Sequence, residues 1–329
     1  MLNYAWTPAV ILIAVTLDVA FGEPPNRWHP VAWMGSLISW WNRVWDSRFA
    51  NVKKAAGRAD HRCGEFLCGC GIVVVGAVLC GMSGCVVQAN ANEGLGVLIQ
   101  AMVLKCCFGF RSLQDAARSV ATELLDKNLF KAREQLAFHL VSRDVSELSA
   151  AEVSAATIES VAENTSDSVI APLLFFVVAG LPGALIYRFV NTCDAMLGYR
   201  TERLEWLGKP AARLDDVLNV LPARITALLM VTASVGHGDR VRAWKTWRSD
   251  ARATASPNAG QPMSAAAGSL GVCLEKRSHY RIGSQFPPPA APDIERMITL
   301  YQRTIVLAVT LTCLSGYLIH WCTGLGNQP

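Results

Sequence analysis

The sequence predicts an all-α, polytopic membrane protein with about four to six membrane segments, some of them broken or re-entrant. Hydrophobic residues make up 52% of the 329 residues, and the mean hydropathy is +0.28. The apolar residues come in blocks, of which 66–87 and 304–321 approach the ~20 residues that cross hydrocarbon. Two soluble domains, which the length also allows, are disfavoured because a soluble core helix is rarely apolar on every face over such a length.

The order of apolar and polar segments predicts a single integral membrane domain over 1–329. The apolar blocks are 7–22, 66–88, 94–110, 168–190, 217–236 and 303–322. The polar segments are 23–65, 111–167, 191–216 and 237–302. Segment 23–65 carries seven Lys or Arg residues and segment 111–167 carries six, whereas the turn 89–93 carries none. By the positive-inside rule, we expect both basic segments to face the cytoplasm and the turn to face away from it.

The first apolar block is predicted to be a retained membrane segment rather than a signal peptide. No Lys or Arg precedes it, and Gly22-Glu23-Pro24-Pro25 follows it in place of a small-x-small cleavage site. We expect Asp18, near its end, to lie at the interface or to face protein, because a lipid-facing carboxylate is costly.

The eleven cysteines are expected to pack as small hydrophobic residues. Most lie in the apolar blocks, and Cys63, Cys68 and Cys70 lack the C-x-x-C spacing of a zinc site. A metal site or a disulfide is the alternative. The net charge of +4 is too small to indicate a nucleic acid partner, so the basic residues are expected to serve membrane topology and phosphate groups.

Block 168–190 is interrupted by Gly180-Leu181-Pro182-Gly183, which a straight helix disfavours. One interpretation is a kinked span that places 191–216 on the far side of the membrane. The other is a pair of half-helices that turn at Leu181-Pro182 and return to the cytoplasmic side, and the four basic residues of 191–216 favour it. Broken segments are tolerated where they line a protein cavity, so this block and 217–236 are expected to form the wall of a site.

Segment 111–167 is predicted to be a mostly helical cytoplasmic segment. Residues 111–125 have helical periodicity, and Ser149 with Glu152 forms the capping-box pattern of a second helix that runs to about Asn164. Segment 237–302 is predicted to be a cytoplasmic loop, and its part 250–302 looks irregular.

An acidic face marks that second helix. Glu152, Glu159 and Glu163 are spaced seven and four apart, so they share one side, and Asp167 continues it beyond the expected helix end. No Lys or Arg lies between these residues to relieve their repulsion. A solvated acidic face is one interpretation, and a divalent cation site is the other, because Mg²⁺ prefers a few carboxylates together with substrate phosphate oxygens. Short polar side chains beside them come from Asn164, Thr165 and Ser166.

Further carboxylates lie at the ends of the broken segments. Asp194 follows block 168–190, and Asp215 and Asp216 precede block 217–236. If block 168–190 turns back, these side chains approach Asp167 on one side. A helix cap or an interfacial anchor is the alternative for each residue, but their recurrence at segment ends favours a site.

Residues 256–260, Ser-Pro-Asn-Ala-Gly, form a turn whose backbone amides suit an anion, with a plain turn as the alternative. The arginines that are candidate phosphate partners are Arg111, Arg200, Arg213, Arg224, Arg248 and Arg252. The sequence contains no G-x-x-x-x-G-K-[ST], no G-x-S-x-G and no H-E-x-x-H. Nucleotide chemistry would therefore have to use an acidic site centred on Mg²⁺.

Six motifs occur in a fixed order. They are 22–35 (Gly-Glu-Pro-Pro, then His-Pro-Val and Gly), 159–167, 191–200, 212–216, 222–224 and 256–260. Together they resemble the adenosylcobinamide-phosphate synthase family (CobD/CbiB) of cobalamin biosynthesis over almost the whole chain. Glu23 stands where the family usually has Asp, Ser168 where Gly is common and Gln261 where an aromatic residue is common. These departures concern substrate choice more than the reaction.

The resemblance implies an ATP-dependent amide ligase of the cytoplasmic (inner) membrane, multi-pass, with its catalytic loops facing the cytoplasm. The family joins adenosylcobyric acid to aminopropanol phosphate, or to a related aminoalcohol phosphate, and gives adenosylcobinamide phosphate. Mg²⁺ is the implied cofactor and ATP the co-substrate. Membrane lipid and other membrane enzymes of the pathway are the further expected partners.

The chemistry assigns roles to the motif residues. Phosphoryl transfer needs Mg²⁺ and basic residues, and the attacking amine must lose a proton to a carboxylate or a histidine. The expected catalytic residues are Glu159, Glu163, Asp167 and Asp194. The expected metal ligands are Glu163, Asp167, Asp215 and Asp216. The expected substrate- or nucleotide-binding residues are His29, Asn164, Thr165, Arg200, Arg213, Ser256, Asn258 and Gly260. For His29, an interfacial histidine without a catalytic role is the alternative.

Two other functions fit a polytopic chain with broken segments. A transporter of the corrinoid or of an anion would carry ionisable residues near mid-bilayer, whereas the carboxylates here cluster at segment ends. A non-catalytic scaffold of the pathway would not need the intact motif set. The enzyme is therefore the favoured prediction.

Overall fold

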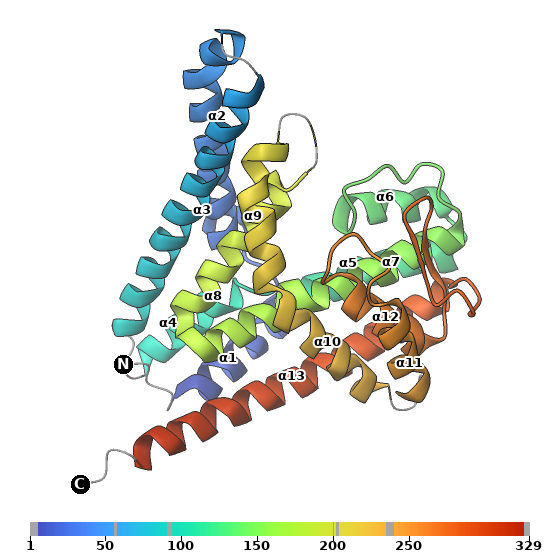
Figure 1. Ribbon diagram of the computed structural model, residues 1–329. Helices are drawn as coiled ribbons and strands as arrows, with labels where there is room; N and C mark the ends of the chain where they lie inside the picture. Colours follow the sequence, from blue (N-terminus) through green and yellow to red (C-terminus); the bar gives the residue numbers. More distant parts are fainter. Residues whose placement is uncertain are drawn as a thin grey trace. The chain divides into compact units, whose positions relative to one another are not determined.

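The computed structural model describes residues 6–55, 58–90, 94–199, 201, 204–234 and 240–325, and it describes side chains outside 46–61 and 323–325. The described chain is helical apart from one two-stranded hairpin (Figure 1). It divides into two compact units. The first comprises 1–108, 172–218 and 315–329, and the second comprises 109–171 and 219–314. The predicted segments 111–167 and 237–302 thus belong to one unit.

The first unit contains most of the long apolar helices. Its helices are α1 (Thr7–Phe21), α2 (Pro30–Ala55), α3 (Arg58–Ala89), α4 (Leu95–Lys105), α8 (Ala171–Leu197) and α9 (Glu205–Leu218), with the 3₁₀ turn η2 (Asn26–Trp28). Many apolar side chains of α3 are exposed, among them Leu67, Val78 and Met82. Such a face is stable in hydrocarbon rather than in water. The predicted turn 89–93 lies between α3 and α4, and its residues 91–93 lie outside the described residues.

Helix α8 is two helices joined at a break. Ala179 and Gly180 have non-helical torsions, and Gly180 has φ +65° and ψ −160°, a conformation that only glycine adopts readily. Beyond the break, the backbone of Gly183 lies against the carbonyl oxygen of Phe175, whereas eight residues of straight helix would advance about 12 Å. The chain therefore turns sharply within the predicted broken block, just before the predicted Leu181-Pro182, as the yellow-green ribbon of Figure 1 shows.

The second unit consists of shorter helices around a small hairpin. Its elements are α5 (Phe110–Leu125), α6 (Leu129–His139), α7 (Ala150–Thr165), the π-helical turn η3 (Ser166–Ile170), α10 (Val220–Ala233), α11 (Arg240–Asp250), α12 (Gly260–Leu270), β1 (Leu274–Lys276), β2 (Tyr280–Ile282) and the larger part of α13 (Ala291–Leu325). The strands pair antiparallel, with Leu274 opposite Ile282.

The prediction that 250–302 is irregular is wrong, because this region contains α12, the hairpin and the start of α13. Helix α12 was missed because every one of its residues is buried, so it has no polar face and no amphipathic period. Its Gly268 packs against α11 so closely that a Cβ would meet the backbone of Ala243. The predicted end of the helix from Ser149 near Asn164 is confirmed, because α7 ends at Thr165, and the π-helical turn η3 then continues the chain directly into α8.

Four helical stretches of the described chain are long and apolar enough to cross a membrane, and a bent pair, α9 with α10, would be a fifth. The four stretches are Arg62–Ala89, Leu95–Leu125, Ala150–Leu197 and Ala291–Cys322. The predicted all-α polytopic membrane fold is therefore confirmed. The stretch Ala150–Leu197 is not one straight crossing, because the chain turns sharply at Ala179 and Gly180. Its part before the turn is already longer than the ~20 residues that cross hydrocarbon. Its apolar block is 168–190, so we treat α7 as lying outside the membrane.

Candidate active site

The start of α7 is fixed by its first turn. The Ser149 side chain accepts from the backbone N–H of Glu152, and the Glu152 carboxylate accepts from the backbone N–H of Ser149 at 2.9 Å. This is the predicted capping box. The Glu152 carboxylate also accepts from Arg277 Nη2 at 2.8 Å. Glu152 therefore anchors the helix to the hairpin, and its charge is balanced by a residue far away in the sequence.

Two helical turns further along α7, Glu159 is buried, with 6% of its surface exposed. Its Oε2 lies 3.8 Å from Arg143 Nη2, and its Oε1 has no hydrogen-bond partner among the described residues. Burial raises the pKa of Glu159 to about 7, against the opposing effects of the Tyr280 hydroxyl, Arg143 and Lys276. A carboxyl group with this pKa can gain or lose a proton near neutral pH, as general bases must.

Tyr280 completes the surroundings of this carboxyl group. It lies in β2, and its hydroxyl acts to lower the pKa of Glu159. Burial and the neighbouring Glu159 raise the pKa of Tyr280 far above its usual range, so the phenol stays protonated. We call Glu159, Arg143, Tyr280 and Lys276 the Glu159 cluster.

A cavity of about 260 Å³ adjoins the Glu159 cluster. Arg143 and Lys276 line it, and so do Glu152, Arg277 and His279. The two cations that lower the pKa of Glu159, Arg143 and Lys276, thus also face this cavity. The sequence missed Arg143, Lys276 and Tyr280, since none of them lies on α7. The only local signal was the concentration of basic residues in 276–281.

The predicted residues after Glu159 are partly exposed carboxylates and side chains that are hydrogen-bonded within the helix. Glu163 and Asp167 are partly exposed. Thr165 is fully buried, and its hydroxyl donates to the Val161 carbonyl at 2.6 Å, so it is committed to the helix. Asn164 donates to the Ser160 carbonyl at 2.9 Å. The π-helical turn begins at Ser166, and such turns are frequent at functional sites.

The donor chemistry here suits Mg²⁺ bound in part by a substrate. Among the described residues, no group of three or more His, Cys, Asp or Glu side chains is placed to hold a metal ion by itself. Mg²⁺ is usually held by one or two carboxylates together with substrate phosphates. Glu163 and Asp167 are two such carboxylates of the second unit. Their role as Mg²⁺ ligands stays a prediction.

In the first unit, the structure brings the end of α8 against α9. Asn191 Nδ2 donates to Asp215 Oδ1 at 3.3 Å, and Arg188 Nη1 donates to Asn191 Oδ1 at 3.4 Å. Asp215 is buried, whereas Asp194 and Asp216 are partly exposed. Asp167 belongs to the second unit, and the predicted approach of these carboxylates to it stays a prediction. Arg213 is exposed, and the predicted Arg200 lies outside the described residues.

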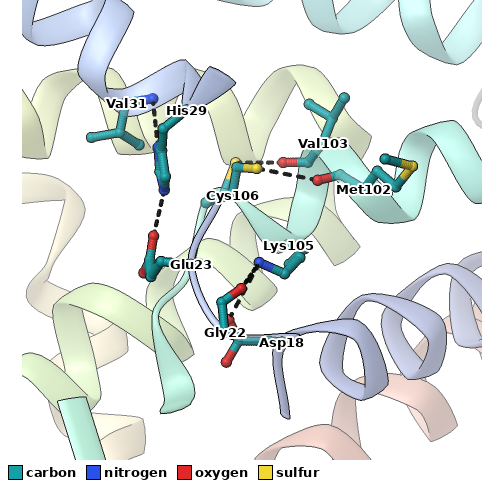
Figure 2. Close-up of polar contacts among 10 residues, drawn as sticks. Asp18, Gly22, Glu23, His29, Val31, Met102, Val103, Lys105 and Cys106 are labelled. Carbon is teal, nitrogen blue, oxygen red and sulfur yellow. Dashed lines mark hydrogen bonds and ion pairs between the residues drawn. The ribbon is translucent and has the colours of Figure 1, made fainter. Parts of the chain in front are cut away.

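His29 lies in a second polar group of the first unit (Figure 2). Its Nδ1 accepts from the backbone N–H of Val31 at 3.2 Å, so its Nε2 carries the proton toward Glu23 Oε2, 2.5 Å away. Near it, Lys105 donates to the Gly22 carbonyl and lies 3.9 Å from Asp18. Asp18 is fully buried, which confirms that it faces protein. The sequence did not show that Lys105 would reach this carboxylate.

The 256–260 turn uses its amides internally. The Ser256 hydroxyl accepts from the backbone N–H groups of Asn258 at 3.2 Å and Ala259 at 3.4 Å. Asn258 Oδ1 accepts from Arg224 Nη1 at 3.3 Å. Gly260 is required by a close approach, because a Cβ there would meet the carbonyl oxygen of Ala251. The turn thus positions an arginine rather than presenting these two amides to a ligand.

Comparisons with known proteins agree with the predicted resemblance. The family model described as CobD/Cbib protein matches residues 11–307. The chain is 40% identical over 283 residues to the cobalamin biosynthesis protein CobD of Dehalococcoides mccartyi, covering 85% of this chain and 87% of the relative. It is 39% identical over 312 residues to the protein of the same name from Geobacter metallireducens, covering 93% of each. No solved structure matches the chain.

Proposed function

The chain belongs to the CobD/CbiB family of cobalamin biosynthesis, and we propose that it is the ATP-dependent ligase that joins adenosylcobyric acid to aminopropanol phosphate or a close relative of it. The product is adenosylcobinamide phosphate. The observation that carries the proposal is the Glu159 cluster, because amide formation needs a group that takes a proton from the amine near neutral pH.

The reaction poses two chemical problems. A carboxylate is a poor acyl donor, so its oxygen is first phosphorylated by ATP, which releases ADP. The amine of the second substrate is an ammonium ion at neutral pH and attacks only after losing a proton; its attack on the acyl phosphate forms the amide and releases inorganic phosphate. We assign the acceptance of this proton to Glu159, whose pKa of about 7 leaves much of it ionised.

The other members of the cluster maintain that state. The Tyr280 hydroxyl and Arg143 both favour the ionised carboxylate and oppose the effect of burial. Arg143 and Lys276, which line the cavity, are suited to a phosphate or carboxylate of a substrate. Mg²⁺, when held by Glu163 and Asp167, would neutralise phosphate charge during transfer.

The proposal includes a location. The polytopic fold places the protein in a membrane, and the basic segments 23–65 and 111–167 support the inner membrane with segments 111–167 and 237–302 facing the cytoplasm. Other membrane enzymes of the pathway are proposed as partners that retain the corrinoid between steps.

The experiment is a direct assay. Purified protein is incubated with adenosylcobyric acid, ATP, Mg²⁺ and aminopropanol phosphate, and ADP and the amide are measured. We expect the two products in equal amounts. Absence of ADP and amide with every aminoalcohol phosphate tried would overturn the proposal in favour of a transporter or a scaffold.

A further inference from the structure

A second cavity of the second unit is lined by arginine side chains. Its volume is about 590 Å³, within the usual range of about 300–1,000 Å³ for small-molecule sites. We call it the arginine basin, and its main lining residues are Arg224, Arg248, Arg252, Trp247 and Gln261. Among the residues that the structure describes, no carboxylate belongs to its lining.

The basin is built on three helices that are packed firmly together. Arg224 comes from α10, Arg248 from α11, and Gln261 from the first turn of α12. Arg252 follows the end of α11. Because α12 is buried throughout and Gly268 lets it approach α11 closely, the walls of the basin form part of the core of the unit.

The polar groups at the base of the basin are held by hydrogen bonds. Arg224 Nη1 donates to the Val220 carbonyl at 2.7 Å and to Asn258 Oδ1 at 3.3 Å. Trp247 Nε1 donates to Gln261 Oε1 at 2.9 Å. A guanidinium group has five N–H donors, so a fixed Arg224 still has donors to offer to a ligand.

The positive charge of the basin is not balanced by the protein. Within the described part of the chain, none of the ion pairs involves Arg224, Arg248 or Arg252. Asp250, which lies between two of them in sequence, accepts instead from the backbone N–H of Gly283 at 2.7 Å. Three like charges around one cavity repel each other, and an anion with several acceptor oxygens would relieve that repulsion.

We propose that the arginine basin binds the phosphate group of a free, phosphorylated small molecule. Arg248 and Arg252, both exposed, would contact the phosphate oxygens, and Arg224 would close the base of the site. The identity of the ester rests on the proposed function, in which ATP and the aminoalcohol phosphate are the two phosphorylated substrates. The phosphate of an anionic lipid has the same chemistry and is the competing source.

The test measures binding without turnover. Full-length protein in neutral detergent is titrated calorimetrically with ATP and with aminopropanol phosphate, in the absence of adenosylcobyric acid. The Arg248→Gln/Arg252→Gln double variant is compared with Lys245→Gln, which removes an exposed cation of α11 that does not line the basin. We expect the double variant to weaken binding of at least one probe about 10- to 100-fold and the control to leave it unchanged.

A second arm separates the two phosphate sources. Flotation with phosphatidylglycerol vesicles is compared with flotation with phosphatidylcholine vesicles for the same variants. Loss of phosphatidylglycerol binding in the double variant, with normal binding of both soluble probes, would overturn the proposal and assign the basin to lipid. Equal affinity of wild type and double variant for both soluble probes would also overturn it, and so would the absence of any binding to the wild type.

Failure of the basin and failure of the proposed function give different results. Probe binding that depends on the two arginines, without ADP or amide formation, would remove the ligase proposal and keep the basin. Amide formation by a double variant that keeps the wild-type affinity for both probes would keep the ligase proposal and remove the basin. Because Arg248 and Arg252 are exposed, their replacement should leave the thermal unfolding midpoint unchanged, which shows that the variant is folded.

Discussion

The Glu159 cluster and the arginine basin are both charged sites of the second unit, but the protein balances their charges in opposite ways. Glu159 is buried, and cations and a phenol from distant parts of the sequence surround it. The three arginines of the basin line a larger cavity whose described lining residues include no carboxylate. A compensated buried carboxyl group with a pKa near neutrality suits proton transfer, whereas an uncompensated cationic cavity suits the capture of an anion. The first site should therefore control the rate of the chemical step, and the second should control affinity.

The largest expected effect is that of Glu159→Gln on turnover. The substitution keeps the size of the side chain and removes its ability to accept a proton, so we expect kcat to fall by about 10²–10⁴-fold. Steady-state amide formation measures it. Glu134→Gln, on the exposed surface of α6, is the control and should retain wild-type activity.

The second effect concerns stability: Glu159→Gln lowers turnover but is expected to stabilise the folded protein at high pH. Glu159 has a pKa of about 7 in the folded protein and 4.5 as an unperturbed group. Stability that is present below pH 4.5 is therefore lost as the pH rises through about 7, a total of about 3 kcal/mol. Glu159→Gln should resemble the protonated wild type, so its stability should nearly equal that of the wild type at about pH 4 and exceed it at about pH 8. Thermal unfolding in detergent measures this difference, and equal midpoints at both pH values would show that Glu159 is not perturbed.

The third effect separates the two sites kinetically. In the Arg248→Gln/Arg252→Gln variant, we expect the KM for one phosphorylated substrate to rise about 10- to 100-fold while kcat changes little. The reason is that the basin would bind the phosphate in the ground state and the transition state alike. A fall in kcat at constant KM would instead place these arginines at the reacting centre and remove the distinction between the two sites.

The smallest effect is that of Tyr280→Phe. The substitution removes one hydroxyl that favours the ionised form of Glu159, so the pKa of Glu159 should rise further. We expect a loss of about three- to tenfold in kcat/KM at neutral pH that is recovered at higher pH, since about one pKa unit corresponds to one hydrogen bond. A loss that is equal at every pH would indicate a role in binding or packing instead.

The sequence predicted the membrane fold, the capping box and the break in block 168–190, because these depend on local composition. It did not predict α12, whose complete burial leaves no periodic pattern. It identified the acidic face of α7 but judged its charges uncompensated, because Arg143, Lys276 and Tyr280 reach Glu159 from other elements. Such contacts arise from tertiary structure, and residue spacing within one helix carries no record of them. The same limit applies to the arginine basin, whose arginines were named singly as phosphate partners but not as the lining of one cavity.

The most direct test of the role of Glu159 is the pH dependence of kcat/KM for amide formation by the wild type and by Glu159→Gln. The account predicts that wild-type activity rises with pH through a single ionisation near 7 and that this ionisation is missing from the residual activity of the variant. An active Glu159→Gln variant with the same pH profile as the wild type would contradict it.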